Sequence, residues 1–115
     1  MTENKTIVEF FERLNLFMRG NLRNEWTFVD GFKMYVRKSK RFFNDKFVDC
    51  FDIASMEAEV QGTGIFTKIL TKLLADYPET NIFVESILNP RLTSFLRNFG
   101  FVEYRTDDMI LIRKQ

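Results

Sequence analysis

Between residues 47 and 87 the spacing of apolar residues changes from strand-like to helical and back to strand-like. "FVDCFDIASM" is rich in β-branched and aromatic residues, and "NIFVESI" has the same character. Between them, from Ile65 to about Tyr77, apolar residues recur with the period of a helix. A strand, a helix and a second strand in this order predict a right-handed crossover with the two strands parallel in one sheet. This unit restricts the chain to the α/β class.

Further elements are expected on both sides of the crossover. The apolar spacing predicts a helix from about Lys5 to Arg19, and "EWTFVD" and "FKMYVRKS" predict two strands, followed by a turn at 44–46. A helix is expected to begin at Asn89-Pro90 and to end at Gly100. "FVEYR" and "MILIRKQ" predict a last pair of strands. The sequence therefore predicts a single domain, residues 1–115, with a mixed sheet.

The composition excludes several classes of function. There is no histidine among the 115 residues, which removes histidine-based triads and HExxH zinc sites. The net charge of +1 gives no general attraction to nucleic acid or membranes, so nucleic acid is a disfavoured partner and a membrane is not expected. No apolar run approaches the roughly 18 residues of a membrane span. The single cysteine, Cys50, is expected in the core and is compatible with a cytoplasmic protein.

The segment "QGTG", residues 61–64, stands between the predicted strand and the helix that follows it. Backbone N–H groups at a helix N-terminus attract anions, and glycines allow a phosphate to approach the backbone closely. The hydroxyl group of Thr63 or Thr67 would add a donor. No Gly-Lys-Ser/Thr and no GxGxxG pattern accompanies the segment. A tight turn is the alternative interpretation of the two glycines.

A second segment, "NIFVESILNPRLTSFLRNFGFVEY" at 81–104, is a strand, an asparagine at its exit and a helix that ends in "FGF". Together with Gln61-Gly62-Thr63-Gly64-Ile65, this segment resembles the GNAT superfamily of acetyl-CoA-dependent N-acetyltransferases. The resemblance covers roughly residues 46–113. It implies a mostly antiparallel central sheet with helices on both faces, and acetyl-CoA as co-substrate.

The resemblance also implies roles for individual residues. Pantetheine would lie between the strand that ends at Met56 and the next strand, and it would accept a hydrogen bond from Asn89. The residues that would bind the cofactor are Met56, Gln61, Gly62, Thr63, Gly64, Ile65, Phe66, Thr67 and Asn89. Glu57 and Glu59 are the candidate general bases, with a solvated turn as the alternative. Leu96 stands where many members have a proton-donating tyrosine; it is expected to be a core residue, and Tyr104 is the nearest tyrosine.

Alternatives to an enzyme remain open at the level of sequence. One is a catalytically inactive GNAT-like protein that acts by binding or assembly, of a size and composition that would suit a phage. Another is a nucleic-acid-binding module that uses the basic cluster "VRKSKR" at 36–41, which aromatic residues flank. Apolar positions of the N-terminal helix spread over more than one face and suit a homodimer contact. Glu85, in an apolar strand, is either on an exposed face or paired and functional.

Overall fold

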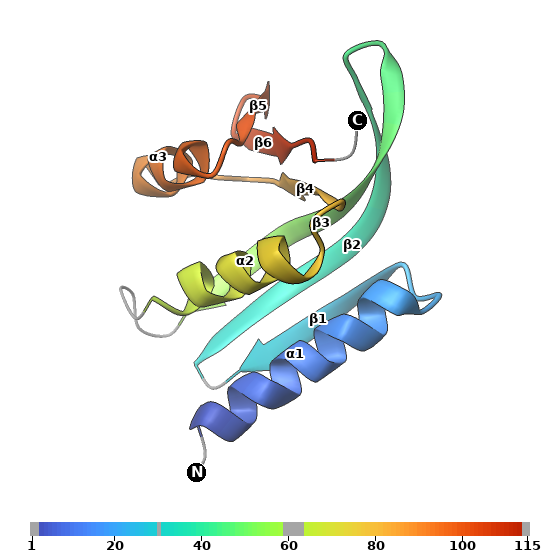
Figure 1. The fold of residues 1–115 in the computed structure, drawn as a ribbon. Coiled ribbons are helices and arrows are strands. Elements are labelled where there is room, and N and C mark those ends of the chain that lie inside the picture. Colours follow the sequence, from blue (N-terminus) through green and yellow to red (C-terminus); the bar gives the residue numbers. More distant parts are fainter. Residues whose placement is uncertain (1–2, 30, 59–63, 114–115) are drawn as a thin grey trace.

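The computed structural model describes residues 3–29, 31–58 and 64–113, without the side chains of 3–6 and 58. Three helices and six strands follow one another along the chain (Figure 1). They are α1 (Glu3–Arg19), β1 (Asn24–Val29), β2 (Phe32–Phe43), β3 (Lys46–Ala58), α2 (Ile65–Asp76), β4 (Asn81–Val84), α3 (Pro90–Asn98), β5 (Val102–Arg105) and β6 (Asp108–Leu111). The predicted order of helices and strands is confirmed.

The strands form one mixed sheet in the order β1-β2-β3-β4-β6-β5. Only β3 and β4 are parallel, with Cys50 opposite Asn81 and Ile53 opposite Val84, while the other neighbouring strands are antiparallel. The parallel pair is the crossover that the sequence predicts, with α2 as its helix. The sheet is therefore mostly antiparallel, as expected.

One face of the sheet carries the helices. Alternate strand residues such as Met34, Ile53 and Val84 lie in a large core cluster with the buried side chains of all three helices. Those helical side chains are Phe10, Leu14, Phe17, Ile69, Leu70, Leu73 and Leu96. In Figure 1, α1 and α2 lie beside each other across this face. Burial of these apolar surfaces is the main force that holds the helices on the sheet.

The opposite face of the sheet has a smaller core. Val48, Cys50, Phe83 and Ile110 form its buried cluster, against which Tyr104 and two other partly buried residues pack. In the described part of the chain, this cluster contains no residue of a helix. The prediction of helices on both faces is therefore corrected: the second core is built from strand side chains and the segments next to them.

The β2–β3 hairpin is longer than the sequence predicts. Asn44 and Asp45 both have positive φ angles, of 51° and 66°, at its two-residue turn. Such angles are typical of the turn whose twist matches that of the two strands, and Asn and Asp tolerate them well. By contrast, β4 ends at Val84, earlier than predicted, because Ser86 has a φ of 60° and the chain turns there.

None of the described helices is long and apolar enough to cross a membrane.

Candidate functional site

Strands β3 and β4 separate after a short parallel contact. The last backbone hydrogen bond between the two segments runs from the Glu85 N–H to the Ile53 carbonyl, at 3.2 Å. The N–H of Ser86 then donates to the Asp108 side chain, and that of Ile87 to the Asp107 carbonyl, so the chain follows β6 instead. Strand β3 continues to Ala58 with β2 as its described partner. Beyond this point β3 and β4 no longer pair, and this is where the resemblance places the pantetheine arm.

Helix α2 begins on the C-terminal side of β3, after the segment of the sequence that contains the glycine motif. Gly64 is the residue before the helix and has a φ of 78°, which glycine adopts without strain. Ile65 and Phe66 pack against the large core cluster, whereas Thr67 is exposed. Met56 is half-buried in β3 and also packs on that cluster. Gln61, Gly62, Thr63 and Glu59 lie outside the described residues.

Asn89 begins α3 as its N-cap. Its Oδ1 accepts a hydrogen bond from the Arg91 N–H at 2.9 Å, which satisfies one of the free amides of the first turn. The side chain is exposed. Asn89 therefore has a structural role as a helix cap, which the sequence Asn89-Pro90 already indicates. Its contact with pantetheine stays a prediction.

The candidate acid and base residues are placed as follows. Glu57 is exposed and lies 3.4 Å from the Lys33 ammonium, also exposed, on the adjacent strand. Leu96 is fully buried, as expected for a core residue. The Tyr104 hydroxyl donates to the Phe42 carbonyl at 3.2 Å, which holds it at the β2–β3 hairpin. Among the described groups, therefore, none of these side chains forms a catalytic pair with another.

A buried ionic network crosses the second face of the sheet, and the sequence analysis missed its central residue. Asp52 is fully buried and accepts hydrogen bonds from Arg41 and Ser39, each at 2.7 Å. Arg37 lies 3.6 Å from the same carboxylate and also pairs with Glu85. Glu85 is therefore paired, as one of its two alternatives has it, and a function for it stays a prediction. The signal in the sequence was the spacing of Arg37, Ser39 and Arg41, which places all three on one side of β2, the strand next to Asp52.

The network also reduces the number of free cations in the basic cluster at 36–41. Arg37 and Arg41 neutralise buried or half-buried carboxylates, and the Arg41 guanidinium stacks 3.7 Å from the centre of the Phe83 ring. The Lys38 ammonium donates to the Gly20 carbonyl at 2.7 Å and lies over the Phe17 ring. All four cations of the cluster thus have partners within the protein, because Lys40 pairs with Asp49; that pair is the most exposed of them.

Beyond this network, β2 and β3 continue as a two-stranded ribbon. Residues 38–43 of β2 have no partner on β1, and residues 46–49 of β3 have none on β4. We call residues 38–49 the β2–β3 arm; Figure 1 shows it extending beyond the other strands. One side of the arm carries Phe42 and Phe47, which are 53% and 70% exposed and contact each other edge to face.

A hollow of about 600 Å³ lies at the base of the arm. Its walls come from the arm, from β3 and from the segment before β4; they include Lys38, Lys46, Phe47, Asp49, Glu79 and Asn81. Lys40, on the same side of the arm as Phe42, pairs with Asp49 at 2.8 Å across the two strands. The arm and this hollow together form an exposed surface with aromatic, basic and acidic side chains.

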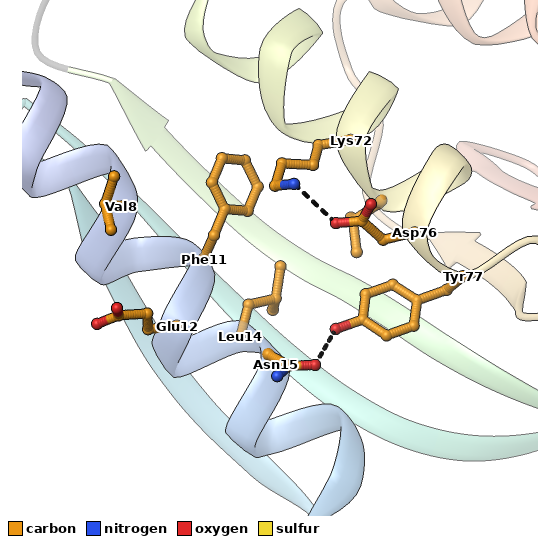
Figure 2. A pocket seen from close by; sticks show the side chains of 9 residues that line it. Val8, Phe11, Glu12, Leu14, Asn15, Lys72, Asp76 and Tyr77 are labelled. Carbon is orange, nitrogen blue, oxygen red and sulfur yellow. Dashed lines mark hydrogen bonds and ion pairs between the residues drawn. The ribbon is translucent and has the colours of Figure 1, made fainter.

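A second hollow, of about 480 Å³, separates α1 from α2 (Figure 2). Its polar groups bind one another: the Tyr77 hydroxyl donates to Asn15 Oδ1 at 2.7 Å, and Lys72 pairs with Asp76 at 2.9 Å. Burial and the nearby Asp76 carboxylate raise the pKa of Tyr77. In this hollow between the two helices, Tyr77, Asn15, Lys72 and Asp76 are therefore already paired, whereas Glu12 has no ion pair among the described residues.

Comparisons with known proteins show a similarity in fold but not in sequence family. No family model and no curated protein matches the sequence. Among solved structures, one similar chain is described as "The crystal structure of KacTA-DNA complex". The TM-score is 0.55 with 14% identity, over 89% of this chain and 80% of that chain. Identity at this level shows a shared fold alone.

These findings contradict the family and the function predicted from the sequence. No GNAT family model matches, and the similar fold is described as a complex with DNA rather than as an acetyltransferase. The assignment to the GNAT superfamily and the N-acetyltransferase function are therefore wrong, whereas acetyl-CoA as a ligand stays a prediction. The prediction that nucleic acid is a disfavoured partner is corrected too, because the structure with the similar fold is described as a complex with DNA.

Proposed function

We propose that the protein binds nucleic acid through the β2–β3 arm. The observation that carries the proposal is the exposed pair Phe42 and Phe47 on a projecting ribbon. Large aromatic side chains are normally buried, and two adjacent exposed ones mark a surface that binds something. The occurrence of a similar fold in a DNA complex supports nucleic acid as the partner.

The dimensions of the arm suit a DNA groove. Each strand of the arm rises by about 3.3 Å per residue, so the arm is roughly 20 Å long. The major groove of B-DNA, about 12 Å wide, admits a two-stranded β-ribbon. Phenylalanine contacts the thymine methyl group in that groove, and it stacks on bases where the nucleic acid is single-stranded.

The charges of the arm allow contacts with phosphate. Lys40 and Asp49 are 71% and 82% exposed, and an ion pair of this kind contributes about 0–1 kcal/mol, so a phosphate can replace Asp49 at small cost. Lys46, at the tip of the arm, is exposed and has no ion pair with any described residue. Two lysines give few phosphate contacts, so we expect modest affinity and a shallow salt dependence, with a slope of about −0.9 per phosphate contact.

The test is fluorescence anisotropy with a labelled duplex and the matching single strand. The variant Phe42→Ser/Phe47→Ser removes the aromatic pair, and Lys40→Ala/Lys46→Ala removes the two cations. We expect the first to lower affinity by about tenfold or more, since a base–aromatic contact contributes about 1–3 kcal/mol. We expect the second to weaken binding and to flatten the salt dependence between about 50 and about 200 mM.

The matched control is Lys68→Ala/Lys72→Ala, which removes the same charge from the exposed side of α2. Circular dichroism of every variant checks that the fold is retained. Equal losses in the control and in the arm variants would show that general charge, and not the arm, holds the nucleic acid. Absence of binding by the unaltered protein at low salt would reject the proposal.

A second candidate is the binding of acetyl-CoA in the gap between β3 and β4, without any transfer reaction. The favouring observation is that, among the described residues, β3 has no strand partner on its β4 side beyond Ile53, while α2 begins after the glycine motif. An added strand-like ligand forms backbone hydrogen bonds with such an edge, and a helix N-terminus attracts phosphate. Thermal unfolding with and without acetyl-CoA tests this; a ligand at about 100 times its Kd adds roughly 2.7 kcal/mol.

A further inference from the structure

Strand β1 forms one edge of the sheet and faces α1. Within the described ranges it pairs only with β2, from Asn24 opposite Arg37 to Val29 opposite Phe32. In an antiparallel pair every second residue directs its N–H and C=O groups away from the partner strand. The outer side of β1 therefore presents backbone groups that an additional strand can pair with.

A hollow of about 450 Å³ runs between this edge and α1. Side chains from both elements line it, among them Glu9, Glu12, Arg13, Leu16, Trp26 and Phe28. We call this hollow the α1–β1 groove. A groove between an edge strand and a helix has the geometry in which an extended peptide adds a strand to a sheet.

The apolar residues of the α1–β1 groove are exposed to an unusual degree. Leu16 and Phe28 are each 62% exposed, and Trp26 is 38% exposed. The rings of Trp26 and Phe28 stack with their centres 6.4 Å apart. Aromatic side chains beside an open strand edge are the type of residue that contributes most to protein–protein contacts. They would contact the side chains of an added strand on one of its faces.

The charge of the groove is acidic. Arg13 is neutralised by Glu25, with 3.1 Å between their charged groups. Glu9 and Glu12 are exposed and have no ion pair in the described part of the chain. Among the described residues, the helical wall of the groove thus carries two negative charges without an ion pair. A partner with lysine or arginine side chains complements this wall, whereas a second copy of β1 would bring the same carboxylates close to it.

We propose that the α1–β1 groove binds an extended basic peptide segment of another protein, which adds to β1 as a seventh strand. The backbone of β1 supplies the hydrogen bonds, Trp26 and Phe28 supply the apolar contacts, and Glu9 with Glu12 selects the basic side chains. The groove lies at the edge of the sheet and shares no residue with the β2–β3 arm. The inference is therefore independent of nucleic-acid binding.

The test uses the single tryptophan of the chain, Trp26, as its reporter. The probe is a capped peptide of about ten residues that alternates valine and lysine, long enough to span an edge strand. The control peptide has glutamate in place of lysine. We expect the lysine peptide to change the emission of Trp26 and to slow hydrogen exchange of β1 amides. The glutamate peptide should bind at least about fivefold more weakly at low salt.

The variant Glu9→Lys/Glu12→Lys should reverse the preference, so that the glutamate peptide binds more tightly than the lysine peptide. Both positions are exposed, so the fold is kept. The matched control is Glu79→Lys/Glu103→Lys, which makes the same change of charge outside the groove and should leave the preference unaltered. Equal binding of the two peptides, no response at millimolar peptide, or an unchanged preference in the groove variant would overturn the proposal. So would a dimer that protects the same β1 amides.

Discussion

The Arg41 guanidinium donates a 2.7 Å hydrogen bond to the Asp52 carboxylate, which is fully buried in the middle of the sheet. Arg41 is itself only 16% exposed. The carboxylate has lost its contact with water, and its charge is stabilised by this arginine together with Ser39 and Arg37. Paired in this way, the charges are tolerated; with one partner removed, the others are left buried and uncompensated.

The first prediction follows from this pairing. Asp52→Ala should lower the free energy of unfolding by about 3–5 kcal/mol, because Arg41 would be left as an unpaired, nearly buried cation. The control is Asp49→Ala, which breaks the exposed pair with Lys40 and should cost less than about 1 kcal/mol. Urea unfolding measures both. Similar losses for the two variants would show that the network is solvated in solution.

A second prediction concerns Leu96, which is fully buried in α3 and packs in the large core cluster. Leu96→Ala should lower the free energy of unfolding by about 2–5 kcal/mol, since it leaves a cavity under the helix. Val102→Ala, at a position that is 50% exposed, should cost much less. Urea unfolding compares the two. A small loss at Leu96 would mean that α3 does not pack on the sheet as described.

The third prediction is a loss of stability at alkaline pH. Burial, with a contribution from the Asp52 charge, raises the pKa of the Cys50 thiol from 9.0 to about 12. Because the folded-state pKa is raised, the neutral thiol contributes fully below about pH 9, and this contribution is lost as the pH rises from 9 towards 12. Each unit corresponds to about 1.4 kcal/mol.

Comparing the protein with Cys50→Ser isolates this effect, because serine does not titrate in that range. Unfolding free energies measured by urea at several pH values should fall more steeply above pH 9 for the unaltered protein than for the variant. The raised pKa of Tyr77 acts in the same direction above pH 10 and is common to both proteins. Parallel curves for the two proteins would contradict the assignment to Cys50.

Much of the fold was predictable because local signals agree with the tertiary structure. The helical spacing from Ile65 and the Pro90 at the start of α3 are read from neighbouring residues. The early end of β4 was not predictable, because it depends on Ser86 and Asp108, which meet only in the folded sheet. The helix-free second face was missed because alternation in a strand does not say which element covers each face.

The candidate surfaces were less predictable than the elements. The basic cluster at 36–41 is visible in the sequence, yet only the structure shows that Arg37 and Arg41 pair inside while Lys40 faces solvent. Phe42 and Phe47 are exposed because β2 and β3 extend beyond the ends of the strands that pair with them, β1 and β4. The α1–β1 groove could not be foreseen, since it depends on how a helix lies against an edge strand.

The last prediction separates the two explanations for the glycine before α2. Gly64 has a φ of 78°, and a Cβ added there would meet nothing within 4 Å. A substitution at Gly64 therefore lowers stability only through the strained backbone conformation, and not through a steric clash. Gly64→Ala should therefore lower the free energy of unfolding by about 1–2 kcal/mol, and Gly64→Asn by less, because asparagine tolerates this conformation.

Gly100 is the matched comparison for Gly64. Its φ is 98°, and an added Cβ would also lie 3.4 Å from Leu111 Cδ1. Gly100→Ala should cost at least as much as Gly64→Ala in the same urea measurement. If Gly64→Ala and Gly64→Asn both leave stability unchanged while they weaken acetyl-CoA binding, the turn does not need glycine, and close approach of a ligand is the better reason for it. If stability falls and no ligand binds, the glycine is explained by the turn into the helix.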